Sequence, residues 1–503
     1  MMQSDIGSKN ISGRGLINHI GILYLIVFFF VLAYGLGISA LLLIIKLPFT
    51  IIFSLGIAIP IAILYLLLPL NYSATIFLIF MMLSHYYLSP IIFPVAGMEL
   101  HPRELMNLAF ISNFLVNVVF GRVYWRKSIF LIFAWLYFLF FIYCAVIGFL
   151  FGHHWQRVVA EIRFPLFFLS SFILPHCWKD LEQLKLTLRV MLGVSLIVVL
   201  MSYALFLYPL VTGRYFRVQN FLGEFLPYKV GPFRLQEVRF NGHMYFELWY
   251  GIFLSSFFAK EKWREKIKSL LLVIIFLFAI LILKMNTALV SVFMISGIII
   301  IAYLPSRLRL FFGLIFTFLI LSFFLTLAYL FYSEILSWTN SRLGISLQAR
   351  LVEVTGALQN FMESPLLGKG FGSMFVGLGL ASNFARDLYA QATFQTLHNL
   401  WFYWLFKGGI IGMILIFSAF LGLFLKSAFL IFGKGEKLRE DAYYWIGWWS
   451  VWISQILIIS LAFPRISYPI GQVFFALSIA CFIVLEGESE KTPVLDKPSN
   501  VRL

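Results

Sequence analysis

Residues 25–45 read LIVFFFVLAYGLGISALLLII, and residues 269–283 read SLLLVIIFLFAILIL. Neither stretch contains a charged residue, and apolar runs of this kind recur along nearly the whole chain of 503 residues. A transmembrane helix needs about 20 predominantly apolar residues, and these runs are too numerous for the buried helices of a soluble core. With 61% hydrophobic residues, 12% charged residues and a mean hydropathy of +0.94, the sequence predicts an all-α polytopic integral membrane protein.

Hydropathy predicts about 12–14 transmembrane helices. In the first half of the chain we expect them near residues 18–40, 48–69, 74–93, 105–120, 129–151, 160–177 and 190–211. In the second half we expect them near residues 244–259, 269–283, 286–303, 308–332, 399–425, 443–463 and 467–485.

Lysine and arginine in short loops predict the orientation, because basic short loops stay on the cytoplasmic side of the membrane. When the helices are alternated, one side holds the N-terminus and the clusters GRVYWRK, KDLEQLKLTLR, KEKWREKIK, PSRLR and GKGEKLRE. This places both termini on the cytoplasmic side of an inner membrane. The predicted segments are tail 1–17, helices 18–211, outer loop 212–243, helices 244–332, outer loop 333–397, helices 398–485 and tail 486–503.

Other features of the composition fit this class. The first fifteen residues are polar and lack a signal-cleavage site, so they are expected to be a cytoplasmic tail. Cys144, Cys177 and Cys481 lie in or beside apolar runs without partners at metal-ligand spacing, which predicts packing residues. The net charge of +16 reflects the cytoplasmic loops of a membrane protein and does not indicate a nucleic-acid partner.

The two long loops on the outer side are the places where chemistry is expected, because connections of such length are usually functional or disordered. In the second loop, Leu351, Val354, Leu358 and Phe361 recur at helical spacing. The segment LQARLVEVTGALQNFM is therefore expected to be an amphipathic helix on the membrane surface.

The first outer loop has an excess of basic residues, against the usual distribution of positive charge. It contains Arg214, Arg217, Lys229, Arg234 and Arg239 but only two acids, Glu224 and Glu237. Arginine donates two parallel hydrogen bonds from a permanent charge and suits phosphate, so an anionic ligand is predicted. The alternative is that single arginines pair with lipid headgroups or with the glutamates of the same loop.

The second outer loop carries three further motifs. Arg350 precedes the segment ESPLLGKGFG, in which Pro365, Gly368 and Gly370 form a P-x-x-G-x-G pattern. The loop closes on His398-Asn399 just before the apolar segment LWFYWLFKGGIIG.

This order of motifs resembles the O-antigen ligase and O-antigen polymerase superfamily, which has an arginine, P-x-x-G-x-G, and H-N before a helix that ends in E-x-G-x-x-G. The family often has R-x-x-G at the exit of the preceding outer loop, here Arg239 to Gly242. One position departs from the pattern, since Lys407 stands where the family has glutamate. It indicates either a different acceptor or a lysine that reaches for a phosphate.

The resemblance implies transfer or polymerisation of a glycan from an undecaprenyl-pyrophosphate carrier, at the outer face of the bacterial inner membrane, in lipopolysaccharide or exopolysaccharide biosynthesis. Its partners would be the lipid-linked donor, a glycan or lipid-linked acceptor, the bilayer and other polysaccharide-assembly membrane proteins. No nucleotide sugar, cofactor or metal is expected. Whether the enzyme is a polymerase or a ligase stays open.

The residue types fit this chemistry. Arg239 and Arg350 are expected to stabilise the diphosphate leaving group, and His398 to act as the base for the acceptor hydroxyl, since histidine titrates near neutrality. The expected substrate-binding residues are Arg214, Arg217, Arg234, His243, Arg163, Asn399, Gly368 and Gly370.

Several residues have simpler alternatives. A lone His398 or His243 can be an ordinary interfacial histidine, and Arg163 can form an internal ion pair with a neighbouring acid. His153 and His154 have no further ligand at metal spacing, so no metal site is predicted. The run GKGFG lacks the preceding strand of a phosphate-binding loop and is expected to be a turn.

Two other classes of function compete with the glycan transferase. A transporter or flippase of lipid-linked glycans would place its binding groups near the bilayer midplane, whereas this chain concentrates polar residues in two outer loops. A noncatalytic scaffold would tolerate the loss of Arg239, Arg350 or His398.

Overall fold

The computed structural model describes only part of the chain. The described residues are 64–83, 93–95, 98–163, 165–214, 223–230, 233–240, 243–282, 286–305, 356–380, 389–394, 400–432, 442–456 and 469–491, with residues 308, 309, 311–313 and 315.

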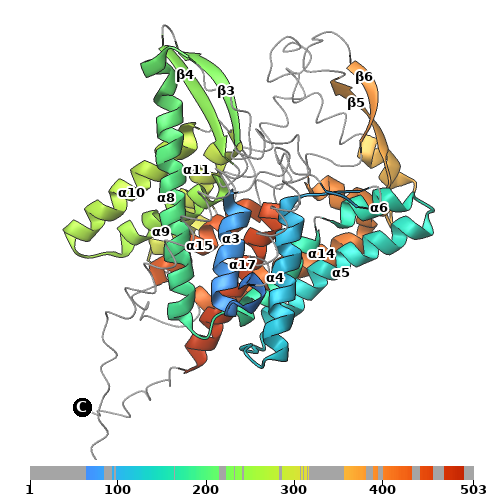
Figure 1. Cartoon of the computed structure of the whole chain (residues 1–503), viewed down its shortest axis with the longest axis horizontal. Coiled ribbons are helices and arrows are strands. Elements are labelled where there is room, and N and C mark those ends of the chain that lie inside the picture. The colour runs from blue at the N-terminus through green and yellow to red at the C-terminus, as the bar shows by residue number, and fades with distance from the viewer. Residues whose placement is uncertain are drawn as a thin grey trace, which may run out of the picture.

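The structure is predominantly helical (Figure 1). Its α-helices are α3 (Leu70–Leu83), α4 (Pro102–Val119), α5 (Ile129–Leu150), α6 (Trp155–Ile162), α7 (Ser170–Ile173), α8 (Leu181–Thr212), α9 (His243–Ala259), α10 (Trp263–Ile282), α11 (Asn286–Tyr303), α14 (Leu400–Phe432), α15 (Ala442–Ser454) and α17 (Pro469–Lys491). Three antiparallel hairpins, which the sequence did not predict, pair β1 (Phe93–Val95) with β2 (Met98–Leu100), β3 (Gly223–Val230) with β4 (Phe233–Phe240), and β5 (Phe375–Leu380) with β6 (Tyr389–Phe394).

Four described helices have the length and apolar composition to cross a membrane: α5, α8, α14 and residues Pro469–Glu488 of α17. A fifth candidate is the bent pair Trp155–Ile162 and Pro165–His176, and shorter apolar helices cover Leu70–Leu83 and Ala288–Tyr303. The class of a polytopic membrane protein is therefore confirmed. The predicted helix 18–40, most of 48–69 and nearly all of 308–332 lie outside the described residues, so the count and the sidedness stay predictions.

The sixth predicted span differs from the single helix expected over residues 160–177. It consists of α6, a 3₁₀ segment Pro165–Leu169, α7 and a second 3₁₀ segment Leu174–His176, with a bend of 40° between α6 and the rest. Pro165 and Pro175 lie at or near the starts of the two 3₁₀ segments. Proline has no N–H to continue the helical hydrogen bonds, which explains the division.

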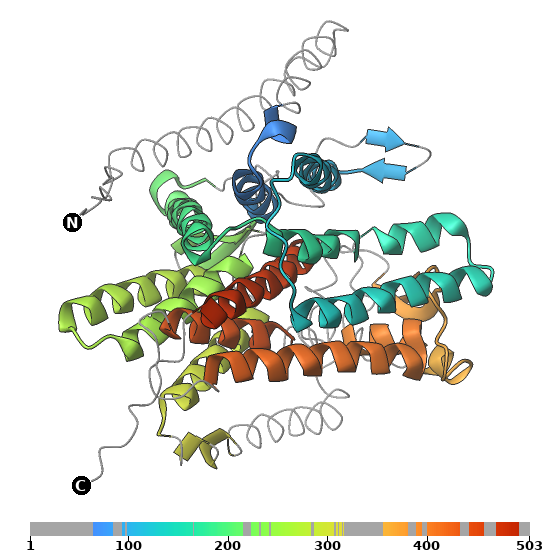
Figure 2. The same cartoon turned by 90° about the horizontal axis from the view of Figure 1, so that it is seen from below.

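Helix α17 forms the centre of the described helices (Figure 2). In the most apolar part of this helix 89% of the residues are buried, against 33% in α5 and 39% in α14. Phe475 of α17 contacts the rings of Tyr137, Phe168 and Phe420 at centroid distances of 5.3, 5.4 and 5.5 Å. The core is therefore an aromatic cluster around α17, while α5 and α14 keep apolar faces exposed as helices in contact with lipid do.

Two of the hairpins lie in the predicted outer loops. β3 and β4 pair residue by residue from Gly223 opposite Phe240 to Val230 opposite Phe233, and β4 contacts the long helix α8. β5 and β6 pair from Phe375 opposite Phe394 to Leu380 opposite Tyr389. Figure 1 shows both hairpins projecting from the same side of the helices, as expected for two loops that share one face of the membrane.

The other predictions for single segments have mixed outcomes. Cys144, Cys177 and Cys481 are free and buried, which confirms them as packing residues. Residues 356–362 are helical, which covers the end of the predicted amphipathic helix, and its first part lies outside the described residues.

Candidate functional site

Helix α14 is broken where it passes Gly408 and Gly409. Gly409 has φ 60° and ψ −162°, a conformation that only glycine adopts readily. In a continuous helix the N–H groups of Ile410 and Ile411 would bond to the carbonyl oxygens of Phe406 and Lys407. The break leaves these four backbone groups without their helical partners, and buried groups of this kind must be satisfied elsewhere.

The segment Pro365–Gly372 (PLLGKGFG), called here the glycine segment, supplies these partners. Ile410 N–H donates to the Pro365 oxygen at 2.9 Å, and Ile411 N–H donates to the Leu366 oxygen at 3.2 Å.

In the other direction, Lys369 N–H donates to the Phe406 oxygen at 2.9 Å and Gly370 N–H to the Lys407 oxygen at 2.8 Å. The glycine segment thus replaces both missing helical hydrogen bonds with four bonds of its own. The P-x-x-G-x-G motif and the glycines of α14 form one structural unit.

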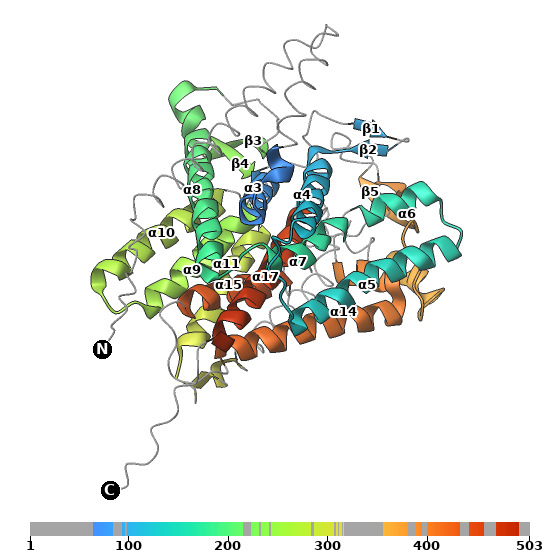
Figure 3. The same cartoon turned by 60° about the horizontal axis from the view of Figure 1, so that its bottom comes forward.

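Close packing explains why glycines stand at these positions. Gly368 and Gly370 have φ of 72° and 73°. A Cβ atom at Gly368 would lie 2.4 Å from Gly409 N, and a Cβ atom at Gly370 would lie 2.1 Å from Gly148 N. Phe371 N–H donates to the Cys144 oxygen of α5 at 2.8 Å. The glycine segment therefore lies between α5 and α14, which run side by side (Figure 3).

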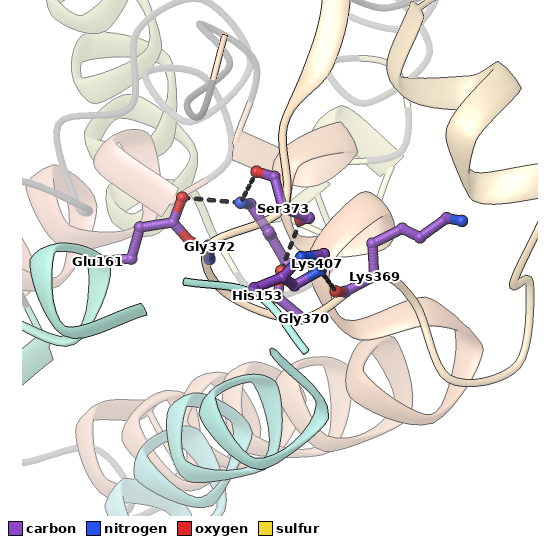
Figure 4. A network of polar contacts seen from close by, with 7 residues as sticks. All are labelled: His153, Glu161, Lys369, Gly370, Gly372, Ser373 and Lys407. Atoms are coloured by element: carbon purple, nitrogen blue, oxygen red, sulfur yellow. Dashed lines mark hydrogen bonds and ion pairs between the residues drawn. The ribbon is translucent and has the colours of Figure 1, made fainter. Parts of the chain in front are cut away.

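A buried ion pair lies next to this unit (Figure 4). Lys407 Nζ, whose side chain is 0% exposed, donates to Glu161 Oε1 of α6 at 2.7 Å and to the Ser373 oxygen at 2.8 Å. The other carboxylate oxygen of Glu161 accepts the Gly372 N–H at 3.0 Å. Lys407 thus has its partners within the protein, and the two alternatives that the sequence offered for it, a different acceptor or a phosphate contact, stay predictions.

His153 adds a contact from the turn between α5 and α6. Its Nε2 lies 2.8 Å from the Lys369 oxygen, in the same network of polar contacts (Figure 4). Among the described residues, no group of three or more His, Cys, Asp or Glu side chains gathers as metal ligands would. The absence of a metal site from the whole chain stays a prediction.

Arg163, at the C-terminal end of α6, makes the internal ion pair that the sequence left open. Its Nε and Nη2 atoms donate to the two carboxylate oxygens of Glu104 at 2.7 and 2.8 Å. Glu104 stands in the first turn of α4 and is 8% exposed. These two bonds join α4 to the end of α6, two positions after Glu161, the partner of Lys407. A substrate contact of Arg163 stays a proposal.

The first outer loop holds the other predicted basic residues. Arg214 is exposed just after α8 ends. Arg234 and Arg239 stand on β4, opposite Lys229 and Glu224 in the hairpin register.

The remaining predicted residues cluster around the ends of described elements or fall outside them. His243 is the first residue of α9. Arg217, Arg350, His398 and Asn399 lie outside the described residues, although Asn399 directly precedes Leu400, where α14 begins. The structure thus brings Gly368 and Gly370 together with α14, and the predicted catalytic residues stay untested.

Three residues of the site were not expected from the sequence: Glu161 and His153, which contact the second outer loop, and Ser373, which belongs to that loop. Glu161 had a usable signal, because it is an acid in an apolar environment and such groups usually have a partner. Its partner stands 246 residues further along the chain. No local pattern connects the two positions.

The fold and site define a polytopic membrane protein in which a segment of a long loop forms backbone hydrogen bonds with a broken helix. The family model described as O-antigen ligase matches residues 271–417, which include the glycine segment, His398 and the break in α14. This match confirms, over residues 271–417, the predicted resemblance to the O-antigen ligase and polymerase superfamily. Among curated proteins, none has a sequence that matches this chain.

Proposed function

We propose that this chain is an O-antigen ligase-like membrane glycosyltransferase of surface polysaccharide assembly. It transfers or polymerises glycan from an undecaprenyl-pyrophosphate carrier at the outer face of the inner membrane. The family match over residues 271–417 supports the general class. The donor, the acceptor and the catalytic residues are part of the proposal.

One observation carries the proposal beyond the family match. The glycine motif lies inside the break of α14, and α14 begins directly after the His398-Asn399 pair. The glycine motif therefore contacts the same helix that the His398-Asn399 pair directly precedes in the sequence. We infer that His398, two positions before Leu400, acts at the start of this helix, which itself contacts α5 and α6.

In the proposed reaction, the acceptor hydroxyl oxygen attacks the anomeric carbon of the donor glycan. The bond between that carbon and the pyrophosphate oxygen breaks, and undecaprenyl pyrophosphate leaves with the electron pair. His398 takes the proton of the hydroxyl, while Arg239 and Arg350 stabilise the negative charge on the leaving group. This mechanism needs neither a nucleotide sugar nor a metal ion.

The remaining basic residues complete the proposed donor site. Arg214, Arg217 and Arg234 belong to the same outer loop as Arg239, and guanidinium groups bind phosphate oxygens in pairs. His243 begins α9 three residues after β4 ends. Such a cluster raises the local concentration of an anionic lipid-linked donor.

A transporter of the same lipid-linked glycans is the second candidate. Transporters bind substrates at the free ends of broken helices near the membrane midplane. In α14 the exposed backbone groups of the break are already taken, because Ile410, Ile411, Phe406 and Lys407 bond to the glycine segment. The break is thus filled by the chain itself, which favours the transferase.

Release of the carrier distinguishes the two functions. The full chain is reconstituted in proteoliposomes with undecaprenyl-pyrophosphate-linked repeat units extracted from the host membrane. A transferase releases free undecaprenyl pyrophosphate, detected by mass spectrometry, and joins the glycans. A transporter moves the donor across the bilayer with the pyrophosphate bond intact. The proposal is contradicted if the donor crosses the bilayer and no carrier is released.

A further inference from the structure

The buried pair Glu161–Lys407 has a fixed polarity. Lys407 Nζ faces a backbone carbonyl, that of Ser373, while Glu161 faces a backbone N–H, that of Gly372. If the two charges were exchanged, a carboxylate at 407 would face the Ser373 oxygen and an ammonium at 161 would face a donor. The backbone therefore determines which side holds the acid and which the base.

The surroundings of Lys407 leave its ammonium group fully engaged within the protein. Besides its bonds to Glu161 and Ser373, Nζ lies 5.2 Å from the ring centre of Phe406 and 5.6 Å from that of Tyr403. The side chain is 0% exposed. A phosphate ligand would have to displace these contacts and enter a closed environment.

The pair connects two of the parts of the chain that carry proposed site residues, α6 with Arg163 and α14 after His398. Glu161 stands two positions before Arg163 near the end of α6. Lys407 is seven positions after the first residue of α14, which at a rise of about 1.5 Å per residue is roughly 10 Å from the helix start beside His398. Gly372 and Ser373, which lie just before the hairpin β5–β6 in the second outer loop, bond to the two members of the pair.

We propose that Glu161 and Lys407 are positioning residues for the transfer reaction. The pair clamps the loop backbone at Gly372–Ser373 between α6 and α14, and so fixes His398 and the second outer loop relative to Arg163. The inference rests on the proposed function and gives Lys407 a role apart from phosphate binding. It also accounts for the departure from the family glutamate, because a glutamate at 407 would face Glu161 and the Ser373 oxygen.

The variants that test this proposal separate charge pairing from phosphate binding. Removing one partner of a buried ion pair leaves an uncompensated charge, whereas replacing both partners by neutral residues of similar volume is often tolerated. The test set is Lys407→Met, Glu161→Gln and the double variant Glu161→Gln/Lys407→Met. In the double variant the glutamine oxygen still accepts the Gly372 N–H.

The same helix offers a matched control. Lys426 of α14 pairs with Glu486 at 2.7 Å, but its side chain is 32% exposed and lies far from the glycine segment along the helix. Lys426→Met therefore removes an ion pair from α14 without changing the clamp. Its transfer activity is expected to remain close to that of the parent, because partly exposed pairs contribute little.

Transfer is measured with the reconstituted chain and carrier-linked repeat units from the host. Each single variant is expected to lose about a hundredfold in kcat, the loss that a misplacement of about 1 Å produces. The double variant is expected to recover to within about tenfold of the parent, with an unchanged KM for the donor. If the double variant is as inactive as Lys407→Met and its donor KM rises, Lys407 contacts the phosphate and the positioning role is wrong.

A structural measurement keeps this test independent of the proposed function. Spin labels are placed at Trp155→Cys on α6 and Met362→Cys before the glycine segment, where the side chains are 48% and 72% exposed. The three native cysteines are buried. Double electron–electron resonance is expected to give a narrow distribution of the distance between the two labels in the parent and in the double variant. In Lys407→Met this distribution is expected to be broad.

His398→Ala separates the two possible failures. It is expected to keep the narrow distance distribution and to lose transfer, since the clamp does not depend on the base. A narrow distribution in both Lys407→Met and Glu161→Gln overturns the clamp, whatever their activity. Full transfer by His398→Ala with a broad distribution in Lys407→Met overturns the proposed role of His398 and leaves the clamp standing.

Discussion

Gly370 donates its backbone N–H to the carbonyl oxygen of Lys407 at 2.8 Å, where the break in α14 removes the helical donor. A segment of the second outer loop thus takes the place of helical hydrogen bonds inside a membrane helix. Backbone groups in a bilayer have no water to bond to, so a broken helix needs such replacement. The glycine motif is explained by this requirement together with the close approach of α5.

Replacement of Gly370 by alanine tests this explanation. The Cβ atom would lie 2.1 Å from Gly148 N, and the residue has φ 73°. We expect a loss of about 1–2 kcal/mol from the left-handed backbone and about 1–3 kcal/mol from overpacking. The melting temperature in detergent should fall clearly.

Gly213→Ala is the matched control for that variant. Gly213 has φ 68°, but a Cβ atom there meets nothing within 4 Å. Only the backbone cost of about 1–2 kcal/mol is expected. Equal melting temperatures for the two variants would show that the close contact with α5 does not stabilise the fold.

For Gly148 of α5, replacement by alanine is expected to destabilise the protein, which is the opposite of the usual effect within a helix. Alanine in a helix interior is normally more stable than glycine by about 1 kcal/mol. At this position a Cβ atom would lie 2.2 Å from the Phe371 oxygen. Gly148→Ala is therefore expected to lower the melting temperature, and a rise would contradict the observed contact between α5 and the glycine segment.

The sequence predicted the membrane class and most described helices because hydropathy depends on local composition. The order of its motifs indicated the resemblance to the O-antigen ligase family. The sequence also left open an ion pair of Arg163 and a role for Lys407. It did not predict that Pro365–Gly372 fills the break in α14. That contact depends on the relative positions of distant helices, and a glycine run by itself is compatible with an ordinary turn.

The Glu161–Lys407 pair was out of reach for a related reason. The two residues stand on different helices and become partners only when the loop backbone lies between them. The hairpin β3–β4 was also missed, because its strands do not alternate regularly between apolar and polar residues. Both features arise from tertiary packing.

Lys407→Glu, which introduces the family residue, should fail in this chain. The new carboxylate would face Glu161 and the Ser373 oxygen in a buried environment. A loss of about 3–5 kcal/mol is expected, as for other broken buried ion pairs. The check is the yield of folded protein on size-exclusion chromatography in detergent.

Lys426→Glu serves as the comparison for this charge reversal. Lys426 is 32% exposed and its partner Glu486 is 13% exposed, so the expected loss of stability is smaller than at Lys407, which is 0% exposed. Folded yields of Lys407→Glu equal to those of Lys426→Glu would contradict the buried position of Lys407.

Arg163 allows its ion pair to be separated from a substrate contact. Arg163→Met leaves the buried carboxylate of Glu104 without its bidentate partner and is expected to lower the melting temperature. The double variant Glu104→Gln/Arg163→Met should recover most of that stability. If Arg163 also binds the diphosphate, as proposed, the double variant keeps a raised donor KM; a normal KM would restrict Arg163 to the ion pair.

The most direct test of the central claim is His398→Ala in the native host, with the exposed His154→Ala as control. Expression level and surface polysaccharide on a gel are measured together. The account predicts normal expression with loss of transfer, seen as single repeats for a polymerase or as untransferred carrier-linked chains for a ligase, and normal glycan in His154→Ala. Unchanged amount and length of surface glycan in His398→Ala would contradict it.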